Sequence, residues 1–207
     1  GNHDGPDYAE YFGHADRAVF TENFTFIMLD NSERRFSDDT LRFFWETMAL
    51  SETRNIIVSF HIPPPNRISG DSLSTAEWNR FEDAVGVWRN RICLMLCGHA
   101  HTYFGDEVDG IRLVVTGGGG ANIRKLERVV DPPHHALEIS MDKDGKPLIF
   151  RRTLVPSQLD AESRDMEEVL RHVYNIQCRN YVTMRIRAEE TERSGRPCMA
   201  QLLRPGM

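Results

Sequence analysis

Three short stretches of this chain carry side chains that can ligate a metal ion or transfer a proton. The chain opens with GNHD, which contains Asn2 and His3, while His61 follows the apolar run NIIVSF and His99-x-His101 follows the apolar run ICLMLC. Imidazole nitrogen and amide oxygen together suit zinc, iron or manganese. Three histidines and an amide oxygen are enough to hold one such ion, so these residues predict a metal site.

The position of these histidines in the predicted fold favours a shared site. The runs over residues 55–61 and 92–97 are short, apolar and typical of strands buried on both faces. In open α/β sheets, functional groups gather beyond the carboxyl ends of the strands. If the backbone is extended, His99 and His101 point the same way, because alternate residues of a strand share a face.

Strands and helices alternate in the first half of the chain, which predicts an α/β fold. Ahead of the two strands above, FTFIML over residues 24–29 predicts another buried strand. Ser37 and Ser74 predict the N-caps of two intervening helices, and Ser74-x-x-Glu77 matches a capping box. The apolar stripes of these helices consist of Leu41, Phe44, Trp45 and Met48, and of Trp78, Phe81, Val85 and Trp88.

The second half of the chain has the signals of antiparallel strands. Asp109-Gly110 and Asp144-Gly145 predict two hairpins, the second between ALEISM and PLIFRRTLV. A last helix is predicted over residues 160–176, and YVTMRIRA predicts a last strand. The four glycines at 117–120 predict a tight turn, since no helix with Lys-Ser or Lys-Thr follows them as in a phosphate-binding loop.

Composition excludes some classes of protein and partner. The formal net charge of −6 argues against specific nucleic-acid binding, which is normally accompanied by a basic surplus. No segment is long and apolar enough to predict a membrane span. Cys93 and Cys97 lie in an apolar strand and are expected to be small buried side chains, which favours a reducing compartment such as the cytoplasm. An N-terminal signal is not observable in a chain that begins without Met.

Three segments of the chain resemble the last three motif blocks of the calcineurin-like metallophosphoesterase family: GNHD, His61-x-Pro63 and Gly98-His99-x-His101. FIMLDNS and VVTGGGGA resemble flanking segments of the same family, and the resemblance covers roughly residues 1–155. It implies an α/β fold, with a layered β-sandwich flanked by helices (αββα). It also implies hydrolysis of a phosphomonoester or phosphodiester by hydroxide at a dinuclear metal site.

The resemblance also implies a role for each matching residue. Asn2, His61 and His99 match ligands of one metal ion, and His101 matches a ligand of the other. His3 is similar to the family histidine that protonates the leaving oxygen, with Asp4 as the carboxylate that orients it.

Two residues just past His61 are candidates for substrate binding. Asn66 and Arg67 follow His61 so closely in the sequence that they could reach a phosphate bound near it. The alternative interpretation is that both are solvated loop residues. His134-His135 is interpreted as an ordinary loop pair, because adjacent strand residues point to opposite faces.

Two motif blocks of the family are absent from the chain. The family normally begins with an Asp-x-His block and a Gly-Asp block, which supply ligands to both metal ions and the bridge between them. We therefore expect residues 1–155 to form a metallophosphoesterase-like domain that lacks its N-terminal part, and residues 156–207 to form a C-terminal helix and tail of unknown role. The complete protein is expected to bind two divalent or trivalent ions (Mn, Fe or Zn), of which this chain holds at most one well. The chain by itself is accordingly expected to be weakly active or inactive.

The expected substrate is a small-molecule phosphate ester or a nucleotide, and bound cations would offset the repulsion between such an anion and an acidic protein. Two alternatives stay open. The absent blocks suggest a scaffold or binding module that keeps the fold without catalysis. Histidine-rich strand ends also occur in metal hydrolases that cleave amides and lactams, although the GNHD block argues against that class.

Overall fold

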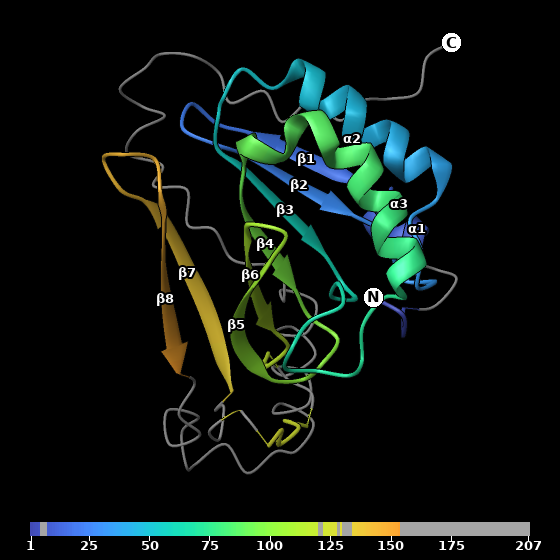
Figure 1. The fold of residues 1–207 in the computed structure, drawn as a ribbon, viewed down its shortest axis with the longest axis vertical. Coiled ribbons are helices and arrows are strands. Elements are labelled where there is room, and N and C mark those ends of the chain that lie inside the picture. The colour runs from blue at the N-terminus through green and yellow to red at the C-terminus, as the bar shows by residue number, and fades with distance from the viewer. Residues whose placement is uncertain (5–7, 120–121, 128, 130–133, 154–207) are drawn as a thin grey trace.

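A computed structural model describes residues 1–153 of the chain, except residues 5–7, 120–121, 128 and 130–133. These residues form one mixed six-stranded sheet, a separate two-stranded sheet and a few helices (Figure 1). The helices are α1 (Tyr8–Phe12), α2 (Asp38–Leu50), α3 (Thr75–Val85) and the 3₁₀ helix η1 (Gly86–Arg91). The strands are β1 (Arg17–Phe20), β2 (Thr25–Leu29), β3 (Ile56–Phe60), β4 (Ile92–Cys97), β5 (Tyr103–Val108), β6 (Ile111–Thr116), β7 (His135–Met141) and β8 (Pro147–Thr153).

The large sheet has the strand order β1-β2-β3-β4-β6-β5. Its four inner strands, β2, β3, β4 and β6, run parallel, and the edge strands β1 and β5 are antiparallel to their neighbours. The chain advances in one direction from β2 to β3 to β4, passing through α2 and then α3. Because such crossovers share one hand, both helices lie on the same face of the sheet, as Figure 1 shows.

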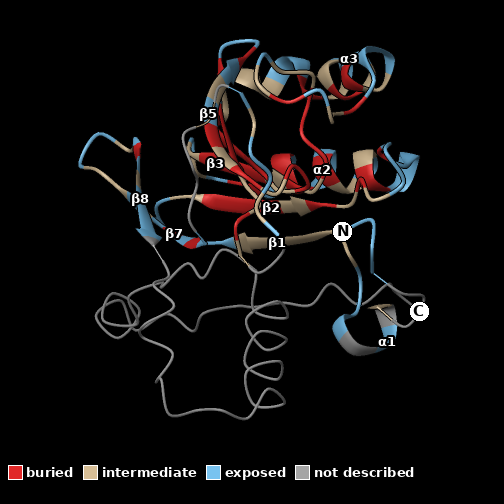
Figure 2. Ribbon diagram, turned by 90° about the horizontal axis from the view of Figure 1, so that it is seen from below, coloured by how far each residue is buried: buried red, intermediate tan, exposed pale blue. Residues whose placement is uncertain are grey.

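The main core lies between these two helices and the sheet. Phe44 and Met48 of α2 and Phe81 of α3 are fully or almost fully buried against sheet residues that include Val58 and Met95. The predicted apolar stripes are thereby confirmed for their central residues (Figure 2). Trp45 differs, because it lies at the margin of the helix layer with 42% of its surface exposed and packs edge-on against Trp88.

The opposite face of the sheet contacts the β7–β8 hairpin. Leu137 of β7 packs in a second apolar cluster with Phe26, Leu94, Leu96 and Val114 of the large sheet. The predicted α/β class is confirmed, since one layer of helices packs on a mixed sheet. The described residues do not include a second full sheet or a second pair of long helices, so the finer αββα prediction stays a prediction.

Most predicted elements of residues 1–153 are present in the structure. Ser37 accepts a hydrogen bond from the Thr40 amide, and Ser74 accepts one from the Glu77 amide, as expected of N-caps. In a capping box the Glu77 carboxylate would accept a hydrogen bond from the Ser74 amide. Here it accepts one from the Phe36 amide instead, at 3.0 Å. Both hairpins form, and Asp109 and Gly110 have the positive φ angles of a type I′ turn.

Three elements were not predicted, and some predictions concern residues outside the described part. The unpredicted elements are the short strand β1, the five-residue helix α1 and the 3₁₀ helix η1, which contains Trp88, a residue expected on the stripe of α3. The predicted helix over 160–176, the strand YVTMRIRA and the division of the chain near residue 155 lie at or beyond the end of the described part.

The aromatic cluster under α3 gives a test of this core. Phe81 stacks on Phe36 with ring centroids 4.5 Å apart and also contacts the rings of Phe44, Phe60 and Trp78. We expect Phe81→Ala to lower the free energy of unfolding by about 3–5 kcal/mol, because it leaves a cavity that the sheet cannot fill. The control Val87→Ala, at a residue 76% exposed, should change it by less than about 0.5 kcal/mol. Similar losses in the two variants, measured by urea titration, would contradict this description of the core.

Candidate metal centre

The register of the three central parallel strands aligns their carboxyl ends. Leu29 of β2 lies beside Phe60 of β3, which lies beside Cys97 of β4. The residues that follow each strand therefore leave the sheet side by side. This alignment brings His61 next to the Gly98-His99 turn, where the Gly98 amide donates to the His61 carbonyl at 3.0 Å.

Three predicted ligands lie together at this edge. His61 Nε2 is 2.8 Å from Asn2 Oδ1 and 3.3 Å from His99 Nδ1. The rings of His61 and His99 meet edge to face with centroids 5.1 Å apart. The structure thus brings together Asn2, His61 and His99, which are separated by up to 97 positions along the chain.

The protonation state of His61 suits ligation. Burial lowers the pKa of His61 to about 4, and the nearby His99 adds to the effect. The imidazole is therefore neutral at physiological pH, which is the form that binds metal ions.

Asn31 fixes the backbone that carries His61. Its Oδ1 accepts hydrogen bonds from the amides of His61 at 3.0 Å and Ile62 at 2.9 Å, and its Nδ2 donates to the Ile62 carbonyl at 2.8 Å. Asn31 itself is fully buried. Its amide thus satisfies three backbone groups at the turn after β3 that the sheet leaves unpaired.

The backbone of the Gly98–His101 segment differs from the extended form expected from the sequence. His99 has φ 59° and His101 has φ 49°, both in the left-handed region, which non-glycine residues adopt at an energetic cost. The Ala100 amide donates to the Gly98 carbonyl at 2.6 Å, which closes a tight turn around His99. The expectation that an extended backbone points the rings of His99 and His101 the same way was therefore wrong. The turn orients each ring separately.

Among the described residues, no hydrogen bond joins His101 to the cluster of Asn2, His61 and His99. Burial, together with the charge of Arg124, lowers the pKa of His101. The charges of His99 and His3 contribute to the same lowering of the pKa of His101. In the described part of the chain no group of three or more His, Cys, Asp or Glu side chains is arranged to hold a metal ion.

The predicted proton-transfer pair is not joined in the structure. His3 is exposed at the chain start, and the Asp4 carboxylate pairs with the amino group of Gly1. No hydrogen bond between His3 and Asp4 occurs among the described residues. Their proposed acid and orienting roles stay predictions.

Asn66 and Arg67 take part in the loop between β3 and α3. Asn66 Oδ1 accepts from the amides of Ile68 at 3.0 Å and Ser69 at 2.7 Å. Arg67 donates through its backbone amide and Nε to Asp106 at 3.1 and 3.0 Å. These contacts shape the loop and anchor it to β5, and a substrate-binding role for either residue stays a prediction.

Sequence reasoning missed Asn31 and Asp71. Asp71 Oδ1 lies 2.9 Å from His99 Nε2 and 2.9 Å from Arg34 Nη2. The hydrogen bond from Arg34 lowers the pKa of Asp71 to about 2, so the carboxylate is ionised. Neither residue matches a motif, although Asn31 lies in the FIMLDNS segment, where its place directly after a buried strand is a usable signal.

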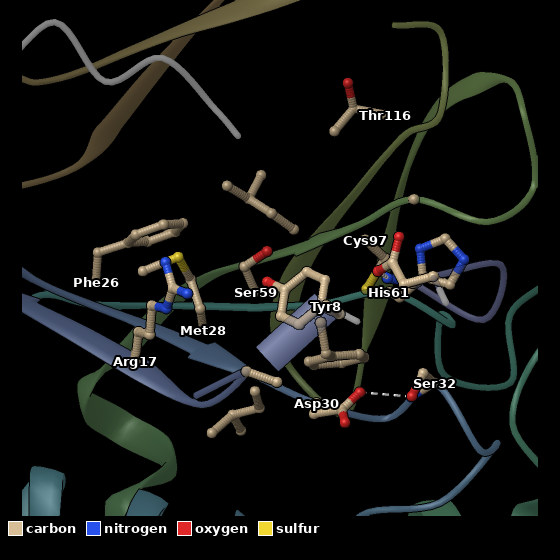
Figure 3. Close-up of a pocket in the computed structure, with 17 residues that line it drawn as sticks. Tyr8, Arg17, Phe26, Met28, Asp30, Ser32, Ser59, His61, Cys97 and Thr116 are labelled. Atoms are coloured by element: carbon tan, nitrogen blue, oxygen red, sulfur yellow. Dashed lines mark hydrogen bonds and ion pairs between the residues drawn. The ribbon is translucent and has the colours of Figure 1, made fainter. Parts of the chain in front are cut away.

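A pocket of about 360 Å³ adjoins the cluster (Figure 3). His61, Gly98 and Asp4 line one part of it, and apolar side chains of the sheet such as Phe26 and Met28 line another. The pocket thus extends from the candidate metal centre over the sheet face opposite α2 and α3.

Comparison with known proteins does not assign the chain to a family. No family model matches it, and no curated protein matches its sequence. Among solved structures it is similar to a candidate 5′-nucleotidase from Staphylococcus aureus in complex with alpha-ketoglutarate, with a TM-score of 0.38 and 10% identity over 78% of this chain and 34% of that chain.

Two further structures show a similar level of likeness. A hypothetical protein from Thermus thermophilus has a TM-score of 0.37 and 14% identity over 68% of this chain and 63% of that chain. GAP50, the anchor in the inner membrane complex of Plasmodium, has a TM-score of 0.35 and 11% identity over 55% of this chain and 40% of that chain. The chain thus spans less than two thirds of each of these structures.

No helix in the described residues is long and apolar enough to cross a membrane.

Gly117 is the packing partner that the Gly98–His101 turn requires. A Cβ at Gly117 would lie 2.6 Å from the His101 amide nitrogen and 2.8 Å from its Cα. We expect Gly117→Ala to displace this turn and to lower the free energy of unfolding by about 1–3 kcal/mol, as overpacking does. Gly105→Ala is the matched control, because its Cβ would meet no atom closer than 3.8 Å. Thermal denaturation of both variants checks this, and equal melting temperatures would show that the close approach is not needed.

Proposed function

We propose that the chain belongs to a metal-dependent phosphoric ester hydrolase, in which Asn2, His61 and His99 hold one metal ion. The observation that carries this proposal is the convergence of Asn2 Oδ1, His61 Nε2 and His99 Nδ1 at separations of 2.8 and 3.3 Å. Ligand atoms about 2.1 Å from a shared ion lie about 3.0 Å apart in octahedral geometry and about 3.4 Å apart in tetrahedral geometry. The two separations from His61 Nε2 are therefore compatible with one shared first-row ion.

The hydrogen-bonding capacity of the three atoms also supports a cation. The Asn2 carbonyl oxygen can only accept, and His99 Nδ1 is an acceptor whenever Nε2 carries the proton and donates it to Asp71. A neutral His61 offers at most one proton at Nε2 to these two acceptors, and its low pKa disfavours the doubly protonated form. A metal ion satisfies all three lone pairs at once.

When bound, such an ion polarises a phosphoryl oxygen and lowers the pKa of a water molecule, which is the chemistry that ester hydrolysis needs. The side chains of this chain would then bind and orient. We propose His3 as the acid that protonates the leaving oxygen, because it is exposed and directly follows Asn2, one of the three proposed ligands. We propose His101 as a ligand of a second ion, whose other ligands are not among the described residues.

A non-catalytic module with the same fold is the second candidate function. It is favoured by the lack, in the part of the chain that the structure describes, of any group of three or more His, Cys, Asp or Glu side chains that could hold a metal ion. A single well-held ion would then stabilise a binding surface rather than activate water.

The assay for this proposal uses the full-length protein, with Mn²⁺ and a panel of aryl phosphomonoesters, aryl phosphodiesters, anilides and lactams. We expect metal-dependent cleavage of at least one phosphate ester and of no amide. His99→Ala should lower kcat/KM on the order of 100-fold, because it removes one of three ligands.

The matched control is His134→Ala, which removes an exposed histidine that bonds only to the Gly118 carbonyl among the described residues. It should leave kcat/KM within about twofold of the unmodified protein, as expected for a surface substitution. Unchanged turnover in His99→Ala, or cleavage confined to amides, would contradict the proposal. Metal binding without any hydrolysis would favour the binding module.

A further inference from the structure

Asp71 lies on the side of the His99 ring that faces away from the cluster. Its Oδ1 is 2.9 Å from His99 Nε2, whereas His99 Nδ1 lies 3.3 Å from His61 Nε2. The His99 side chain is almost fully buried, and that of Asp71 is 32% exposed. The two ring nitrogens therefore have different partners, a carboxylate on one side and the candidate ligand group on the other.

The ring nitrogens of a neutral histidine divide donor and acceptor roles between them. A carboxylate can only accept, so a short contact with Asp71 places the proton of His99 on Nε2. Nδ1 then presents its lone pair toward Asn2 and His61. The opposite tautomer would place a proton inside the cluster and bring the Nε2 lone pair within 2.9 Å of the carboxylate, with Arg34 Nη2 at the longer distance of 3.2 Å as the donor to Nε2.

Two arginines and a backbone contact hold Asp71 in this position. Arg34 Nη2 donates to Asp71 Oδ1 at 2.9 Å, and Arg124 Nη1 lies 3.4 Å from Oδ2. Arg124 is itself tied to the turn, since its amide donates to the His101 carbonyl at 2.8 Å. The amide of Asp71 donates to Ser69 Oγ at 3.1 Å, which fixes the backbone of the loop.

We propose that Asp71 is a positioning residue that fixes His99 in the tautomer with the proton on Nε2, and thereby directs Nδ1 toward the site shared with Asn2 and His61. The consequence for metal affinity rests on the proposed function, whereas the tautomer itself does not. Arg34 contributes by orienting the carboxylate, since its Nη2 lies closer to Asp71 Oδ1, at 2.9 Å, than to His99 Nε2, at 3.2 Å.

The direct test is ¹⁵N NMR of the imidazole groups in the metal-free chain at pH 8.5, about two units above the ordinary pKa of histidine. We expect His99, assigned from its loss in His99→Ala, to show protonated Nε2 and unprotonated Nδ1. In Asp71→Leu, which removes the acceptor at similar volume, the signals should move toward a mixture of both tautomers. An unchanged His99 spectrum in Asp71→Leu, or a proton on Nδ1 in the unmodified chain, would overturn the proposal.

Metal affinity gives a second readout with a matched control. Co²⁺ titrations followed by visible absorption should show a roughly 10–100-fold weaker Kd in Asp71→Leu, as for other residues that orient a ligating histidine. Asp106→Asn is the control, because Asp106 anchors the same loop through Arg67 without touching His99. Its Kd should stay within about twofold, while an equal loss in both variants would assign the effect to loop loosening and overturn the role of Asp71. If the unmodified chain binds no Co²⁺, the proposed metal site fails, and the NMR result still decides the role of Asp71.

Discussion

The candidate site depends on one constraint, the register of three parallel strands. Leu29, Phe60 and Cys97 lie side by side at the ends of β2, β3 and β4, so the next residues of each strand leave the sheet at one level. A slip of one residue would turn the side chains of a strand to the other face. It would separate His61 from His99 and withdraw Asn31 from the turn that it caps. The helices on one face and the hairpin on the other hold this register through two apolar clusters.

The turn after β4 has a strained backbone conformation that sets the orientation of its histidine side chains. His99 and His101 both occupy the left-handed region, and Gly117 is the neighbour that leaves room for this turn. Such strain is retained only where the surrounding structure determines it. Here the buried strand β4 precedes the turn, the Gly98 amide ties it to His61, and the Arg124 amide closes it from the other side. Rigid elements therefore hold both ends of the turn that carries His99.

Much of this arrangement was predictable, and the remainder has identifiable physical reasons. Apolar runs, N-cap serines and Asp-Gly turns predicted the strands, helices and hairpins, because those signals are local in the sequence. They also placed His61 and His99 after neighbouring strands. Asn31 and Asp71 were missed because their partners are 30 and 28 residues away and depend on strand register and loop closure. The extended form of the His99–His101 segment was a wrong expectation, since backbone strain imposed by tertiary contacts leaves no local signal.

The central claim is that Asn2, His61 and His99 share one metal ion. Anomalous diffraction at the zinc edge, from crystals of the chain equilibrated with Zn²⁺, tests this claim most directly. The account predicts one strong peak within about 2.0–2.2 Å of Asn2 Oδ1, His61 Nε2 and His99 Nδ1. A peak bound elsewhere, or a zinc-free cluster in which these atoms keep their separations of 2.8 and 3.3 Å, would contradict it.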